Sequence, residues 1–205
     1  MSRYFKYNYL NPNNFGTRGK FFRPRGCVTD EENYLKNLDN WASFSGQKGT
    51  WILEDDVNMQ GTIEIEDGQT LCIAQDVLLQ IIENSNLFPN PRILVKAGGK
   101  LNIYGTVKYF ATTGGGTFME IRGDVLVRPG GSLINTRTGG QAQNMYINFN
   151  SGTFVNRGTF KNKGITDIEQ LPGLKLENYG TIVNTGTITP LSSIVNHPGS
   201  ICIGC

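Results

Sequence analysis

Residues 150–165 repeat one short phrase at six-residue intervals. The copies read Asn150-Ser-Gly-Thr-Phe154, Asn156-Arg-Gly-Thr-Phe160 and Asn162-Lys-Gly-Ile165. The phrase resumes as Asn178-Tyr-Gly-Thr-Ile182 and Asn184-Thr-Gly-Thr-Ile188, and Asn196 stands two steps later. Asn and Gly tolerate the left-handed backbone that a tight corner requires, and Thr followed by an apolar residue suits the start of a strand. The stretch therefore predicts short strands joined by tight corners, and its Asn residues are expected to stack as hydrogen-bonded ladders.

A looser form of the pattern extends over most of the chain. Two apolar residues stand six positions apart around a Gly-containing turn at 65–71, 95–101, 127–133, 176–182 and 195–201. Such periodicity is typical of solenoids, whose coils bury a core only by stacking on their neighbours. We predict an all-β protein, a single-stranded parallel β-helix over residues 51–205. The uneven spacing before residue 150 favours a right-handed helix, and a left-handed hexapeptide helix is the alternative.

The predicted corners are marked by glycines, and one corner contains the single histidine. The corner glycines are Gly68, Gly98, Gly99, Gly130, Gly131, Gly152, Gly158, Gly180, Gly186 and Gly199. Any Ser-His-Asp or Cys-His catalysis would have to use His197. The repeat aligns His197 with the corner residues Ala97 and Pro129, so we predict a solvent-exposed turn residue there. The predicted strands include Val77–Ile82 and Lys100–Val107, the latter as one uninterrupted strand.

Residues 1–28 form a basic, aromatic arm. The first 26 residues contain six of the 19 cations and none of the 17 acids, which leaves 13 cations against 17 acids for the rest of the chain. Disordered segments contain few aromatic residues, so we predict that this arm docks on something: first another subunit, second its own body, and last single-stranded nucleic acid. Its predicted contact residues are Arg3, Tyr4, Phe5, Lys6, Tyr7, Tyr9, Phe15, Arg18, Lys20, Phe21, Phe22, Arg23 and Arg25.

Residues 29–50 are expected to cap the solenoid. Thr29-Asp-Glu-Glu32 matches a capping box, and Tyr34, Leu35, Leu38, Trp41 and Ala42 fall at helical spacing. This pattern predicts a short amphipathic helix over 30–42. Its expected role is to cover the first coil, which otherwise exposes core residues and free strand edges.

The Asn-Gly-Thr repeats resemble the β-solenoid repeats of adhesin- and haemagglutinin-like proteins, and similar solenoids of large DNA viruses. The resemblance covers roughly residues 60–205 and lies in a degenerate repeat. It implies a rigid parallel β-helix that serves as a surface or structural element.

Outside the arm, few residues are candidates for catalysis or ligand binding. Glu64 and Glu66 alternate with Ile63 and Ile65, so both carboxylates are expected to face outward. Asp67 follows at the same corner, and Glu54, Asp55 and Asp56 lie after Trp51. They suit a solubilising face first, and a polysaccharide-active site second. Cys202-Ile-Gly-Cys205 is interpreted as packed thiols first, then an end-closing or intersubunit disulfide, then a shared metal site. Tyr104, Tyr109 and Tyr179 are expected to face outward, where they could stack on sugars. No cofactor, metal or catalytic residue is predicted.

The predicted function follows from these parts. Residues 200–205 continue a strand pattern without a closing cap, and an open last coil needs a partner. We therefore predict a non-enzymatic structural protein, a minor virion component such as a capsid cement, fibre or spike element, which assembles through its arm and its open solenoid end. The alternatives are a carbohydrate-binding adhesin or spike module and, third, a small polysaccharide lyase or hydrolase. The sequence contains neither a secretory leader nor a membrane span, which predicts synthesis in the reducing cytoplasm and a place in a virion or surface assembly.

Overall fold

The described strands form three parallel sheets. The computed structural model describes residues 33–83, 92–111, 117–136, 146–169, 171 and 174–205. Sheet A contains, in spatial order, β1 (Tyr34–Leu35), β2 (Gly49–Leu53), β5 (Gln69–Ile73), β8 (Lys100–Ile103), β11 (Asp124–Val127), β14 (Thr153–Asn156), β17 (Leu176–Asn178) and β20 (Ile194–Asn196). Sheet B contains β3 (Val57–Met59), β6 (Leu78–Glu83), β9 (Thr106–Ala111), β12 (Ser132–Asn135), β15 (Thr159–Asn162), β18 (Thr181–Asn184) and β21 (Ile201–Ile203). Sheet C contains β4 (Thr62–Ile65), β7 (Arg92–Val95), β10 (Thr117–Ile121), β13 (Tyr146–Phe149), β16 (Ile165–Ile168) and β19 (Thr187–Thr189).

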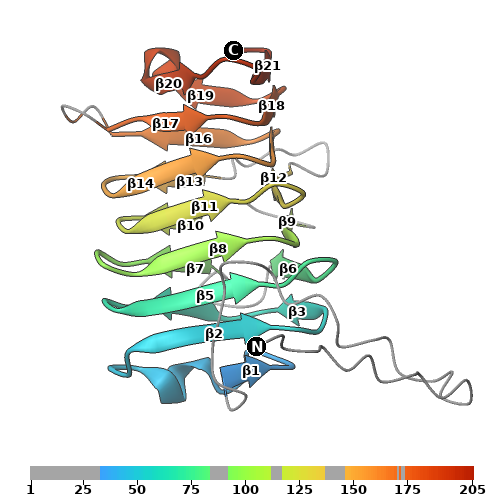
Figure 1. The fold of residues 1–205 in the computed structure, drawn as a ribbon, viewed down its shortest axis with the longest axis vertical. Coiled ribbons are helices and arrows are strands. Elements are labelled where there is room, and N and C mark those ends of the chain that lie inside the picture. Colours follow the sequence, from blue (N-terminus) through green and yellow to red (C-terminus); the bar gives the residue numbers. More distant parts are fainter. Residues whose placement is uncertain (1–32, 84–91, 112–116, 137–145, 170, 172–173) are drawn as a thin grey trace, which may run out of the picture.

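The chain visits the three sheets in turn, so each strand pairs with the strand one coil earlier and the strand one coil later. The pairing of β5 with β8 and of β8 with β11 is parallel, and the same holds for the other printed neighbours. Figure 1 shows the coils stacked along the long axis, with β1 and β2 near one end and β20 and β21 at the other. The prediction of an all-β parallel β-helix is confirmed, and its right-handed coil remains a prediction.

The core lies inside the stack and is filled mainly by alternate residues of the strands. In β11, Val125 and Val127 are fully buried whereas Asp124 and Leu126 are half-buried. Aromatic rings fill the central coils, where Phe154 lies 6.1 Å from Phe149 and 5.3 Å from Phe160 between ring centroids. Because a single coil is one strand thick and cannot bury its own inward side chains, the core forms only when coils stack on one another.

Two details of the predicted strands are wrong. The predicted single strand over 100–107 is divided into β8 and β9 by a corner at Tyr104 and Gly105. At that corner a Cβ on Gly105 would stand 2.2 Å from the carbonyl oxygen of Ala74. The prediction that Tyr109 faces outward is also wrong: its side chain is fully buried, because it shares the inward register of Asn135 on sheet B.

The cap differs from the predicted helix over 30–42. Residues 30–32 lie outside the described residues, and Tyr34 and Leu35 form strand β1, which pairs with Ile52 and Leu53. The only regular helix of the described cap is the short 3₁₀ helix η2 (Trp41–Phe44). The helix does not form because residues 34–35 pair with the open edge of β2. In addition, residues 36–40 include Asn and Asp, which are weak helix formers.

The cap nevertheless covers the first coil. Leu38 and Trp41 are buried in the same core cluster as the solenoid strands. The rings of Trp41 and Phe44 lie 5.8 and 5.2 Å from the ring of Trp51 on β2. The Trp41 Nε1–H also donates a 2.7 Å hydrogen bond to the carbonyl oxygen of Glu64. These contacts close the end of the apolar core.

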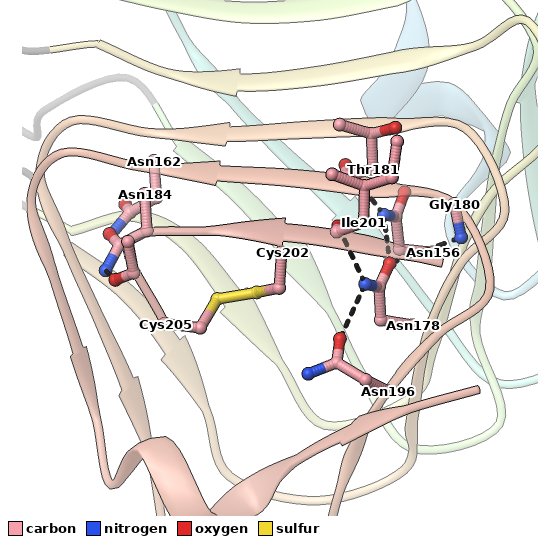
Figure 2. The surroundings of a disulfide bond; sticks show 11 residues. Asn156, Asn162, Asn178, Gly180, Thr181, Asn184, Asn196, Ile201, Cys202 and Cys205 are labelled. Carbon is pink, nitrogen blue, oxygen red and sulfur yellow. Dashed lines mark hydrogen bonds between the residues drawn. A yellow bond between two sulfur atoms is a disulfide. The ribbon is translucent and has the colours of Figure 1, made fainter. Parts of the chain in front are cut away.

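Two ladders of asparagines line the corners of the C-terminal coils (Figure 2), which confirms the predicted stacking. In the first, Asn156 Nδ2 donates to Asn178 Oδ1 and Asn178 Nδ2 donates to Asn196 Oδ1, both at 2.8 Å. In the second, Asn135, Asn162 and Asn184 are joined in the same way at 2.8 and 2.9 Å. The ladders are confined to these coils because the equivalent earlier positions are apolar or aromatic.

The predicted corner glycines fall into two groups. One group has φ values between +76° and +84°: Gly68, Gly98, Gly130, Gly152 and Gly199. In the other group an added Cβ would come within 2.1–2.3 Å of a carbonyl oxygen of the preceding coil: Gly99, Gly131, Gly158, Gly180 and Gly186. The first group supplies a backbone conformation, and the second allows adjacent coils to approach closely. Gly152 meets both requirements, because an added Cβ would also stand 1.9 Å from the Gly123 carbonyl oxygen.

Candidate functional site

The outward carboxylates of the first coil are held by neighbouring groups. Glu64 lies on β4 and Glu66 follows it, and both face Lys96 of the next coil. The Lys96 Nζ is 2.5 Å from Glu64 Oε2 and 3.6 Å from Glu66 Oε1. Glu66 also accepts hydrogen bonds from the Gly46 amide at 2.7 Å and from the Ser45 hydroxyl at 3.1 Å. The pair therefore joins the loop that follows η2 to the first two coils.

The protonation of this cluster follows from the same contacts. The hydrogen bond from the Gly46 backbone, followed by that from Ser45, lowers the pKa of Glu66 below its ordinary value. The hydrogen bond to Glu64 raises the pKa of Lys96. Both effects favour the charged forms of Glu66 and Lys96.

We expect Glu66→Gln to destabilise the cap in a pH-dependent manner. Because the pKa of Glu66 is lowered in the folded state, its stabilising effect is fully present above the ordinary pKa of 4.5 and is lost as the pH falls through the lowered value. The difference in urea midpoint between wild type and Glu66→Gln should therefore shrink as the pH falls from 7 to below 4. A difference that is independent of pH would contradict an electrostatic role.

The remaining acids of the first coil are exposed. Glu54, Asp55 and Asp56 lie in the turn between β2 and β3. The Asp56 carboxylate accepts a 2.8 Å hydrogen bond from the Leu78 amide of the next coil. Within the described parts of the chain, no cluster of three or more His, Cys, Asp or Glu side chains is arranged to hold a metal ion.

His197 stands at a corner, but its surroundings differ from the predicted exposed turn. Its ring stacks on Tyr179, with centroids 3.8 Å apart and planes 5° apart. Its Nε2 contacts the Glu177 carboxylate. The Arg157 guanidinium also lies over the Tyr179 ring, 4.8 Å from its centroid. The histidine is therefore packed into a three-residue stack, and its side chain is 29% exposed.

Cys202 and Cys205 form a disulfide at the last described coil (Figure 2). Packed thiols, the first interpretation of this pair, are wrong, and the disulfide, the second, is observed. Since both sulfurs are bonded to each other, the pair does not offer the thiolates that a shared metal site requires. No free thiol occurs among the described cysteines.

An exposed apolar strand lies beside this disulfide. Ile201 and Ile203 of β21 are 54% and 56% exposed. Both alternate with Cys202, and β21 pairs with β18 alone within the described chain. The predicted contact residues of the arm, which all lie within residues 1–28, are outside the described residues.

A column of side chains at the corner between sheets A and B was missed by the sequence reasoning. Its members, which we call the corner column, are Tyr104, Arg128, Arg157, Tyr179 and His197. The backbone amide of each donates to the coil before, as from Arg128 to Ile103 and from His197 to Asn178. His197 is therefore equivalent to Arg128 and not to Ala97 or Pro129, which corrects the predicted alignment. The column could have been predicted from the sequence by aligning the residues that directly follow the last inward residue of each sheet A strand.

Comparisons with known proteins add no relative: no family model, curated protein or solved structure matches this chain. Of the helices that the structure describes, none has the length and hydropathy needed to cross a bilayer.

Proposed function

We propose that this protein is a non-enzymatic structural component of a larger assembly, a minor virion element of the capsid-cement, fibre or spike kind. It attaches through its N-terminal arm and through the solenoid end at β20 and β21. The observation that carries the proposal is the exposed strand β21, with two isoleucines more than half exposed beside a strand edge that pairs with no other described strand. Exposed apolar strand edges invite pairing and are normally covered.

The rest of the molecule supports a structural role. The asparagine ladders and the aromatic core make the coils rigid. The side chains that could take part in chemistry are paired with other residues of the solenoid. Lys96 holds Glu64 and Glu66, whereas His197 is stacked on Tyr179. The disulfide at the last coil suits a virion or surface location, since disulfides persist in such environments. Cytoplasmic synthesis is part of the same proposal.

The test is the mass of the particle in solution, measured by light scattering after size exclusion. We expect the full chain to form oligomers of defined mass, and Ile203→Lys or removal of residues 1–26 to shift them towards monomer. Leu171→Lys is the matched control, because Leu171 is 48% exposed but lies between β16 and β17. A full chain that is a stable monomer, or equal effects of the two lysine variants, would refute attachment through β21.

A further inference from the structure

The corner column combines cations with aromatic rings on one line along the solenoid. Adjacent members stand one coil apart, which is about 4.8 Å in a parallel sheet. The Arg128 guanidinium lies 5.7 Å from the ring centroid of Tyr104, and that of Arg157 lies 4.8 Å from Tyr179. Arg128 is further oriented by Asn102, whose Oδ1 accepts hydrogen bonds from it at 2.9 and 3.2 Å. The two arginines therefore stand on adjacent coils, each with its guanidinium group held against a tyrosine ring.

The two arginines are available to an external anion. Arg157 is exposed and Arg128 is half-buried. Neither forms an ion pair with a carboxylate of the described chain, and Glu177, a carboxylate that contacts the column, is paired with His197. Guanidinium groups that are pre-oriented by aromatic stacking bind sulfate, carboxylate and phosphate with little further loss of entropy. The column therefore presents a double positive charge without an internal partner.

A second column, of hydroxyl groups, runs beside the first. It consists of the first residues of four sheet B strands, which share one register: Thr106, Ser132, Thr159 and Thr181. Each is directly preceded by a glycine, such as Gly158 before Thr159. A Cβ on Gly158 would collide with the Gly131 carbonyl oxygen at 2.3 Å. Between the two columns the chain contains only Gly105, Gly158 and Gly180, and Pro129, Gly130 and Gly131 in the remaining coil, so no large side chain separates the columns.

We infer that this corner binds a linear anionic polysaccharide, one that carries sulfate or carboxylate groups, along the axis of the solenoid. The arginines contact the anionic groups, and the serine and threonine hydroxyls lie where sugar hydroxyls pass. Nucleic acid fits less well, because single strands bind by stacking bases on open aromatic faces. The ring of Tyr179 is already in contact with the Arg157 guanidinium and stacked with the His197 ring. This inference does not depend on the oligomeric state proposed above.

The inference is tested with the full chain and defined probes. Titration calorimetry with heparin, polygalacturonate, neutral dextran and single-stranded DNA, at equal ionic strength, separates sulfate, carboxylate, neutral and nucleotide ligands. We expect binding to heparin, polygalacturonate or both, with no binding to dextran. Arg128→Gln combined with Arg157→Gln should weaken the binding by about 100-fold, since each lost charge-assisted hydrogen bond is worth roughly tenfold.

Two further variants separate the site from net charge and from misfolding. Arg122→Gln also removes one cation at a corner, but at the corner between sheets C and A, where Arg122 Nη2 is 2.5 Å from Glu120 Oε1. The affinity of this variant for the glycan should be within about twofold of wild type, because a remote charge is screened by salt. Thr159→Glu places an anion in the hydroxyl column, leaves the corner column intact and should abolish binding. The inference would be overturned if neither anionic glycan bound, or if DNA bound more tightly than the glycans. It would also be overturned if Arg157→Gln alone lost no more affinity than Arg122→Gln, or if Thr159→Glu still bound.

Discussion

Replacing Asn162 by Ala is expected to destabilise the protein by about 3–5 kcal/mol, because several buried polar groups lose their partners together. Asn162 is fully buried at the centre of the second ladder. Its Nδ2 donates to Asn184 Oδ1 and to the carbonyl oxygen of Thr187, both at 2.9 Å. Its Oδ1 accepts from Asn135 Nδ2 and from the Thr166 hydroxyl. Alanine satisfies none of these groups, and the site is closed to bulk water. Urea denaturation followed by circular dichroism measures the change.

Asn148→Ala is the matched control for this prediction. Asn148 lies on β13 and is half-buried on the outward side of its strand, between buried Ile147 and Phe149. The same change in composition should alter stability there by less than about 0.5 kcal/mol, as is usual for surface substitutions. Similar losses in the two variants would mean that the ladders are incidental to stability. Asn162→Asp is not a suitable test of the ladder, because that variant also buries an extra charge.

The repeats after residue 150 made the C-terminal coils of the fold predictable. The phrases that begin at Asn156, Asn178 and Asn184 each contain an inward Asn, a close approach at Gly and the start of a strand, so the local signals agree with one another. Asn156 and Asn162 accordingly occupy equivalent corners of their coil, one after sheet A and one after sheet B. Before residue 150 the same architecture is specified only by apolar alternation. That pattern identified most strands but did not place the corner at Gly105.

The errors have a common physical cause, which is contact between coils far apart in sequence. The register of His197 was predicted from a six-residue apolar spacing, but hydrogen bonds across coils place Asn196, and not Val195, inward beside Asn178. Tyr34 and Leu35 have helical spacing, but the free edge of β2 offers backbone partners that a helix lacks. The corner column likewise exists only after stacking, because Arg128 and Arg157 are 29 positions apart in the sequence but equivalent in their coils. A propensity or a spacing within one coil cannot report these contacts.

Gly131→Ala is expected to destabilise the protein by about 3 kcal/mol or more, a value typical of overpacking against rigid structure. A Cβ on Gly131 would stand 2.1 Å from the carbonyl oxygen of Ile103 in the preceding coil. That oxygen belongs to the backbone of a paired strand and accepts the hydrogen bond from the Arg128 amide at 2.9 Å. Relief of the clash therefore requires that two coils separate, which weakens the parallel ladder between β8 and β11. Urea denaturation again gives the free energy of unfolding.

The adjacent residue supplies the control, because Gly130 and Gly131 are glycines for different reasons. Gly130 has φ +84°, and a Cβ there meets nothing within 4 Å. Gly130→Ala should therefore cost only about 1–2 kcal/mol, the strain of an L-residue in a left-handed conformation. The expected order, with Gly131→Ala the more damaging, separates the two requirements of a solenoid corner. If Gly130→Ala were the worse variant, the conformation of the turn, and not the close approach of successive coils, would limit the sequence at this corner.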